Sequence, residues 1–255
     1  MSDYALLLLL IIAHILGDFY LQPTQWVQCR YTKHFKSPSL YKHAGIHGIL
    51  TFLVLTLFSP ASMLTCAALA VIILICHLII DLLKSYFAPN LIYFLIDQAL
   101  HLLCLGAVWG WLNNWNLDTV ILGLKNITNE KVLMIAIAYI VCAKPASIII
   151  SLILKKWSPH INLGVDPKST HNQASRSLVS AGEAIGYLER WLIISFVLLN
   201  QFSGIGFLLA AKSVFRFNDL SKSKDMKLTE YIMLGTFSSV IIALAMGLLT
   251  AFVIQ

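Results

Sequence analysis

The sequence alternates long apolar runs with short polar connections. Eight of the runs reach or approach the length of about 20 residues that an α-helix needs to cross a bilayer. They cover residues 4–21, 43–58, 61–83, 92–112, 131–154, 179–200, 203–216 and 229–253. The pattern predicts an all-α polytopic membrane protein, a helix bundle with about eight transmembrane helices.

The composition supports this fold class. Of the 255 residues, 58% are hydrophobic and 12% are charged, whereas a soluble domain carries about 25% charged residues. The first apolar run contains His14 and Asp18 and has no basic segment before it, so it is not expected to be a cleavable signal peptide. The five cysteines are scattered without a CxxC pair, which predicts free thiols and no disulfide framework.

The distribution of charge between the runs predicts their orientation. Connections 22–42, 155–178 and 216–228 are basic and Lys84 follows the third run, whereas the intervening connections are uncharged or nearly neutral. Basic connections stay in the cytoplasm, so we expect both termini outside it. The net charge of +6 then follows from orientation and from contact with anionic membrane lipids. Nucleic-acid binding is not expected, since no basic stripe with interleaved aromatic residues occurs.

Each of the first four apolar runs contains two metal-ligating residue types four positions apart. Such a spacing places both side chains on one face of a helix. Because successive helices run in opposite directions, all four pairs are expected in the cytoplasmic half of the bundle. The pairs are His14 with Asp18, His43 with His47, His77 with Asp81, and Asp97 with His101.

The pairs predict a metal site. Ionisable groups inside a bilayer are costly and are often functional, and helix-borne imidazole and carboxylate pairs suit zinc, manganese or iron. Eight candidates exceed one tetrahedral shell, so two ions with a bridging carboxylate are one arrangement; one ion with some members as outer partners is another. Asp18, Asp81 and Asp97 are the candidate catalytic bases or bridges. A polar network or proton relay without metal is the alternative.

The order of these pairs indicates two modules. HxxxD followed by HxxxH resembles HxxxD followed by DxxxH, as a duplicated helical hairpin would produce. We therefore predict a four-helix module over residues 1–112. A second membrane module is expected over 113–255, with a cytoplasmic loop at 155–178.

Several cations are candidates for holding an anionic substrate group. Alternatively they have structural roles, such as snorkelling to the interface for Lys84 or pairing with Glu183 for Arg190. The candidates are Lys84, Lys144, Arg190, Lys212 and Arg216.

The motifs HILGDFYLQ, HLIIDLLK, DQALH and the tail pattern IGYLERW…AAKSVFRF…EYIMLGT resemble an uncharacterised bacterial membrane family, domain of unknown function 3307. The HLIIDLLK element is also distantly similar to bacterial inner-membrane proteins named as metal-dependent hydrolases. The resemblance implies a multi-pass protein of the bacterial inner membrane.

These observations together predict a metal-dependent membrane hydrolase that acts at the cytoplasmic side on an amphiphilic or phosphate-bearing substrate. A bound metal would activate water for this reaction. No serine or cysteine stands in a nucleophile motif. One alternative is a cation or proton transporter or channel that uses the same cluster, and another is a non-catalytic membrane subunit whose polar cluster only fixes helix packing.

Overall fold

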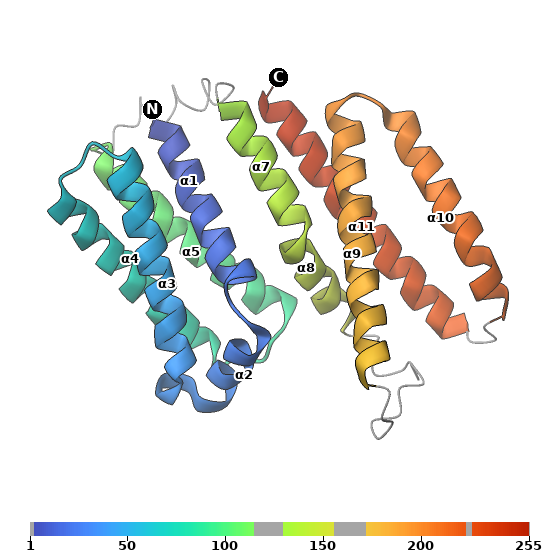
Figure 1. Cartoon of the computed structure of the whole chain (residues 1–255), viewed down its shortest axis with the longest axis horizontal. Helices are drawn as coiled ribbons and strands as arrows, with labels where there is room; N and C mark the ends of the chain where they lie inside the picture. The colour runs from blue at the N-terminus through green and yellow to red at the C-terminus, as the bar shows by residue number, and fades with distance from the viewer. Residues whose placement is uncertain (1–2, 115–129, 156–171, 223–225, 255) are drawn as a thin grey trace. The chain divides into compact units, whose positions relative to one another are not determined.

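The computed structural model describes residues 3–114, 130–155, 172–222 and 226–254 (Figure 1). Within these ranges the chain is helical and has no strand, which confirms the predicted all-α class. The helices are α1 (Asp3–Ile15), the π-helix η1 (Leu16–Tyr20), α2 (Thr24–Lys33), the short 3-10 helix η2 (His34–Lys36), α3 (Pro38–Phe58), α4 (Met63–Lys84), α5 (Leu91–Leu112), α7 (Lys131–Cys142), α8 (Lys144–Leu154), α9 (Asn172–Leu198), α10 (Phe202–Lys222) and α11 (Met226–Ile254).

Several of the helices are able to span a membrane. Among the described residues, five are long and apolar enough: α3, α4, α5, α7 with α8, and the 229–254 part of α11. A sixth is added when the segment Tyr4–Tyr20 is counted with Thr24–Lys36, to which it is bent by 80°. The structure therefore has five or six candidate spans, and the count of eight stays a prediction.

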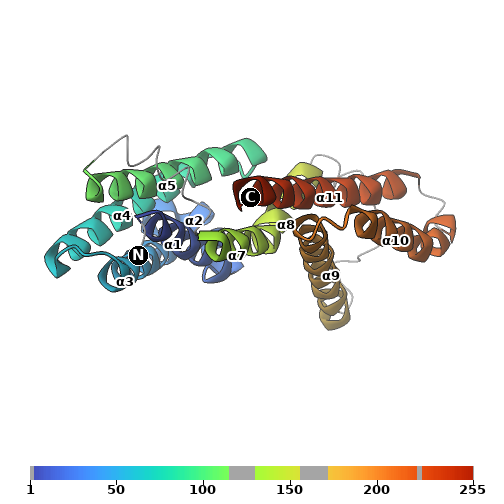
Figure 2. The same cartoon turned by 90° about the horizontal axis from the view of Figure 1, so that it is seen from above.

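The chain divides into two compact units, the first over Met1–Ile137 and the second over Ala138–Val253. In the first unit, four long helices pack in a closed order. Helix α3 contacts α1 and α4, α4 also contacts α5, and α5 returns to α1. Figure 2, viewed from above, shows these four helices as neighbours. The closed order encloses one interior, into which every helix projects a face.

Local signals fix where these helices begin. The side-chain oxygen of Ser62 accepts a hydrogen bond from the Thr65 amide at 3.2 Å, and Asn90 does the same for Tyr93 at 2.9 Å. Both are N-caps that satisfy amides left free by the first turn of a helix. Helix α3 starts with Pro38 in its first turn, where the missing amide hydrogen costs nothing. These starts set the register of the pairs on α3, α4 and α5.

The interior of the first unit is apolar at one end and polar at the other. The apolar part is a cluster of buried side chains from α1, α3, α4 and α5: Leu6, Leu10, Leu55, Cys66, Leu69, Ile73, Leu105 and Val108. The polar part lies toward the opposite ends of the same helices and holds the histidines and aspartates. The apolar part supplies the packing energy that brings the polar ends together.

The second unit contains a helix break. Helix α7 ends at Cys142, Ala143 leaves the helical conformation, and α8 begins with Lys144 and Pro145. A break of this kind leaves backbone carbonyls without their helical partners. Buried side chains of α9, α10 and α11 form the apolar core of this unit, namely Ile193, Val197, Ile205, Val240 and Ala243.

Candidate metal centre

The first predicted pair lies where α1 changes into a π-helix. His14 is in the last turn of α1, and Asp18 is in η1. A π-helical turn is wider than an α-turn and is frequent at functional sites. Gly17, between the two, lies against His47: a Cβ atom at Gly17 would come within 2.4 Å of the imidazole Cε1 of His47. The close approach of η1 to α3 therefore requires glycine at this position.

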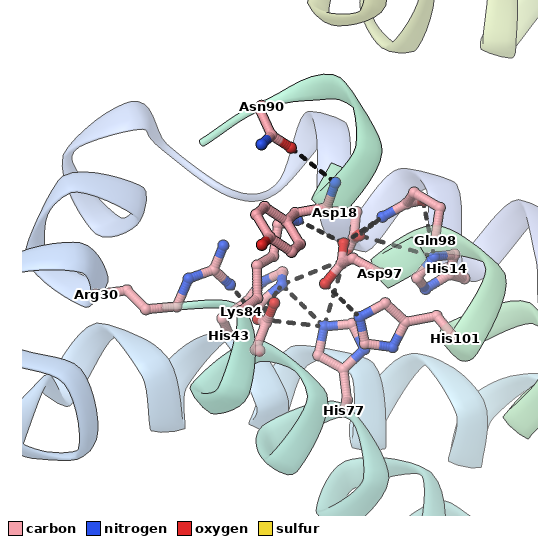
Figure 3. Close-up of polar contacts among 12 residues, drawn as sticks. His14, Asp18, Arg30, His43, His77, Lys84, Asn90, Asp97, Gln98 and His101 are labelled. Carbon is pink, nitrogen blue, oxygen red and sulfur yellow. Dashed lines mark hydrogen bonds and ion pairs between the residues drawn. The ribbon is translucent and has the colours of Figure 1, made fainter. Parts of the chain in front are cut away.

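All eight histidines and aspartates of the predicted pairs meet in one cluster. Figure 3 labels His14, Asp18, His43, His77, Asp97 and His101 among them. They come from four helices and η1, at the ends of α1 and α4 and in the first half of α3 and α5. Seven of them are buried, and the side chain of Asp18 is 10% exposed. Four pairs that are separate in the sequence are thus one site.

Asp18 lies at the centre of the cluster. Its Oδ1 atom is 3.2 Å from the Nε2 atom of His43, 3.0 Å from that of His47 and 3.3 Å from that of His77. Its Oδ2 atom is 3.7 Å from the Nε2 atom of His14. One carboxylate therefore faces imidazoles from three helices.

Four imidazoles form the layer closest to the apolar core. The ring of His77 stacks on those of His47 and His101, with centroids 3.6 and 3.9 Å apart. His14 closes the layer with centroid distances of 5.3 Å to His47 and 5.0 Å to His101. These four side chains, with Cys76 and Cys104, line a cavity of about 10 Å³. Such a cavity has room for about one water molecule.

The other two carboxylates are each paired with a cation. Asp81 forms an ion pair with Arg30, and its Oδ2 atom is 3.4 Å from His43 Nε2 and 3.6 Å from His77 Nε2. Asp97 accepts a hydrogen bond of 2.5 Å from the Lys84 ammonium. The cations thus contact the carboxylates, which in turn contact the imidazoles.

Gln98 connects two members of the cluster. Its amide nitrogen donates to Asp18 Oδ2 at 2.7 Å and to Asp97 Oδ2 at 3.1 Å. Its carbonyl oxygen is 3.4 Å from His14 Nε2. Gln98 therefore orients two carboxylates and one imidazole, as partners outside the ligand shell do in metal sites.

The donor atoms form three overlapping sets, each with its atoms within 4.8 Å of one another. Asp18 and His77 belong to two sets each. The sets are His14, Asp18, His47 and His77; His43, His77 and Asp81; and Asp18, Asp97 and His101.

Several of the buried oxygen and nitrogen atoms that could bind a metal have no hydrogen-bond partner among the described residues. They include Asp18 Oδ1, Asp81 Oδ2, Asp97 Oδ1, His47 Nε2 and His101 Nε2. Buried polar atoms are normally hydrogen-bonded because leaving them unpaired costs about 1–3 kcal/mol each. The residues thus fit cations held by these donor sets, which would satisfy the unpaired atoms.

Two features of the site were not assigned to it from the sequence. Arg30 stands in the basic connection 22–42, and Gly17 lies inside the first predicted pair. The sequence signal for Arg30 is weak. It is the single arginine among the cations of this connection, which are otherwise lysines. For Gly17 the position between His14 and Asp18 was the available signal.

The cations predicted to hold a substrate are distributed over both units. Lys84 belongs to the cluster, whereas Lys144, Arg190, Lys212 and Arg216 are in the second unit. Lys212 pairs with Glu189. Lys144 is half-buried at the start of α8. The side chain of Arg216 and residues 156–171 of the predicted loop 155–178 lie outside what the structure describes.

Arg190 is bound at the break between α7 and α8. Its guanidinium donates to the carbonyls of Cys142 and Ala143 and to the hydroxyls of Ser147 and Ser239. Next to it, the indole nitrogen of Trp191 donates to the Tyr139 carbonyl at 2.9 Å. The pair from α9 therefore satisfies the carbonyls of Tyr139 and Cys142, whereas the Ala143 carbonyl also accepts a hydrogen bond from the Ser147 amide at 3.3 Å. Arg190 and Lys212 also line a cavity of about 940 Å³ within the second unit.

The fold and the site define a helical protein with several possible membrane spans and one buried His/Asp cluster. The model of a family described as "Protein of unknown function (DUF3307)" matches residues 6–128, the stretch that contains the whole cluster. No curated protein and no solved structure matches the chain. The likeness to metal-dependent hydrolases and the bacterial origin stay predictions.

Proposed function

We propose that the His/Asp cluster binds one or two divalent transition-metal ions and that the protein is a metal-dependent membrane hydrolase. Its substrate would be an amphiphilic or phosphate-bearing molecule reached from the cytoplasmic side. The observation that carries the proposal is the convergence of three imidazole nitrogens at 3.0–3.3 Å on Asp18 Oδ1, a buried oxygen that has no hydrogen-bond partner among the described residues.

The donor set supports a transition metal over calcium or magnesium. Imidazole with carboxylate is the ligand combination of zinc, manganese and iron sites, whereas calcium and magnesium take oxygen ligands. Asp18 belongs to two donor sets, so its carboxylate is the natural bridge if two ions bind.

The residues of the chain would divide the work of hydrolysis between them. A bound ion supplies activation of water, whose pKa it lowers toward about 7, and polarisation of the scissile group. His14, His43, His47, His77 and His101 would hold the ion together with the carboxylates. A carboxylate left outside the ligand shell, from Asp18, Asp81 or Asp97, would accept the proton of the attacking water. Gln98 would keep His14 and Asp18 in place through its hydrogen bonds.

The apolar half of the first unit supports hydrolysis over transport. A transporter that used this cluster would need polar groups along the bundle beyond it. Instead, the interior past the histidines is filled by buried side chains, among them Leu10, Leu55 and Leu105. A site that is closed on its apolar side suits a reaction better than a passage.

Metal content tests the first part of the proposal. Protein purified in detergent without added metal should contain one or two equivalents of a transition metal by mass spectrometry. The double variant His77→Ala/Asp81→Ala should lose it, because it removes members of all but one donor set. His34→Ala is the matched control: His34 stacks on Tyr86 and bonds Ser85 outside the cluster, and its loss should leave the metal content unchanged.

Hydrolysis is tested on the metal-loaded protein with phosphoester and lipid substrates. Activity should disappear with a chelator and return when the metal is restored. A stable wild-type protein that contains no metal and takes none up would contradict the proposal and assign the cluster to a proton relay or to packing. A metal-loaded protein that hydrolyses none of these substrates would contradict the reaction but keep the site.

A further inference from the structure

Arg30 is a buried cation at the edge of the His/Asp cluster. It lies in α2, the short helix after the bend that follows η1, and is 4% exposed. Its guanidinium forms an ion pair with Asp81. In Figure 3, Arg30 approaches the cluster from the edge opposite His14 and His101. The chain therefore turns back after its first apolar helix to place an arginine beside the carboxylates.

The hydrogen-bond donors of Arg30 are only partly used. Its Nη1 atom is paired with Asp81 Oδ2, whereas its Nε atom is buried and has no hydrogen-bond partner among the described residues. A guanidinium carries five N–H donors in a planar fork that matches two oxygens of one anion. Burial of a charged group with unused donors is costly, and a bound oxyanion would remove that cost.

The charges around the cluster also favour an anion. Three carboxylates, from Asp18, Asp81 and Asp97, face two cations, Arg30 and Lys84, which leaves a net charge of −1 with neutral imidazoles. One divalent ion changes this to +1. A buried site with that charge is complemented by one further negative charge, such as that of a phosphodiester.

We propose that Arg30 and Lys84 form the anion subsite of the metal centre and that this subsite binds a phosphate group. The inference rests on the proposed function: if Asp81 and Asp97 helped to hold an ion, Arg30 and Lys84 would have donors to share with an anionic ligand. Arg30 supplies the fork that fixes the orientation of the phosphate, and Lys84 supplies a second charge. The phosphate group belongs either to a lipid head group or to a soluble phosphoester.

Phosphate binding by metal-loaded protein tests this subsite. Isothermal titration in a maltoside detergent, with inorganic phosphate as the probe, should show binding by the wild type. Arg30→Gln should weaken it by about 10–100-fold, the effect of losing a charge-assisted pair of hydrogen bonds. Arg30→Lys should weaken it less, because it keeps the charge and loses the fork. Lys33→Gln, which removes the same charge from an exposed position of the same helix, should change the affinity less than about twofold.

Metal content, measured in every sample, separates the possible failures. A metal-free wild type overturns the proposed function. Metal-loaded wild type that binds no phosphate, or metal-loaded Arg30→Gln that binds it as the wild type does, overturns only the subsite. Loss of metal from Arg30→Gln but not from Lys33→Gln also overturns it, because Arg30 would then serve to position Asp81.

A second titration with short-chain phosphatidylglycerol identifies the source of the phosphate group. Tighter binding than that of inorganic phosphate indicates a lipid head group, and weaker binding indicates a soluble phosphoester.

Discussion

At the scale of single residues, the site depends on one position without a side chain as much as on its histidines and aspartates. Gly17 lets η1 approach the His47 ring so closely that any Cβ would overlap it. The chain around Gly17 is tied to the site on both sides, by His14 and by Asp18. A substitution there must therefore move either the imidazole of His47 or the carboxylate of Asp18.

We expect Gly17→Ala to destabilise the protein by about 1–3 kcal/mol, as overpacking of a buried site does. The variant should also lose metal, because His47 leaves its place. Gly45→Ala is the control: Gly45 lies on α3 between His43 and His47, and a Cβ there meets nothing within 4 Å. It should be neutral or stabilise by up to about 1 kcal/mol. Thermal unfolding in detergent and metal analysis measure both effects, and equal behaviour of the two variants would contradict the steric explanation.

At the scale of elements, the second unit shows how a broken helix is kept inside a bundle. Arg190 and Trp191 are neighbours on α9. Their side-chain N–H groups donate to three backbone carbonyls at the break, those of Tyr139, Cys142 and Ala143. In an apolar environment such carbonyls must be satisfied within the protein. The side chains of α9 thus replace the helical hydrogen bonds that the carbonyls of Tyr139 and Cys142 lose at the break.

The loss of stability should increase with the number of these hydrogen-bond donors that a substitution removes. Arg190→Ala is expected to destabilise the protein by about 2–4 kcal/mol, because it leaves the Cys142 carbonyl and the hydroxyls of Ser147 and Ser239 without the guanidinium donor. Trp191→Phe removes one hydrogen bond and keeps the ring, so it should cost about 1 kcal/mol. Chemical unfolding in detergent measures both. If Arg190→Ala were as stable as Trp191→Phe, the guanidinium would not be the main support of the break.

The same scale shows what could be predicted from the sequence. The pairs could be recognised because the helical period brings positions four apart to one face, so that His77 and Asp81 needed no tertiary information. Consecutive antiparallel helices then fixed the end of the bundle at which each pair lies. The contribution of Arg30 could not be predicted in this way, because it depends on the 80° bend before α2. The π-helical turn at Asp18 and the partners of Arg190 likewise follow from tertiary packing.

At the scale of the whole molecule, the predicted orientation is the property that most needs an experiment. The alternation of basic and neutral connections predicts both termini outside the cytoplasm, and this requires an even number of spans. The five or six candidate spans recognised by length and hydropathy include both an odd and an even count. The position of the C-terminus therefore distinguishes them.

Reporter fusions in a bacterial host measure that position. Alkaline phosphatase fused after residue 255 should be active and green fluorescent protein at the same place dark, because the C-terminus is expected outside the cytoplasm. The same reporters fused after residue 156, in a basic connection, should give the opposite result. A fluorescent fusion at the C-terminus would contradict the predicted position of the C-terminus outside the cytoplasm.

The distribution of donors over the first unit has a consequence for biogenesis. No single helix holds more than two of the eight His/Asp side chains, and α5, which supplies the last two, is also the helix that closes the bundle. A chain that has inserted only its first three long helices lacks Asp97, His101 and Gln98. With the proposed ion, retention of metal would therefore report that the bundle is complete, and the ion would favour the finished unit over every partly inserted form.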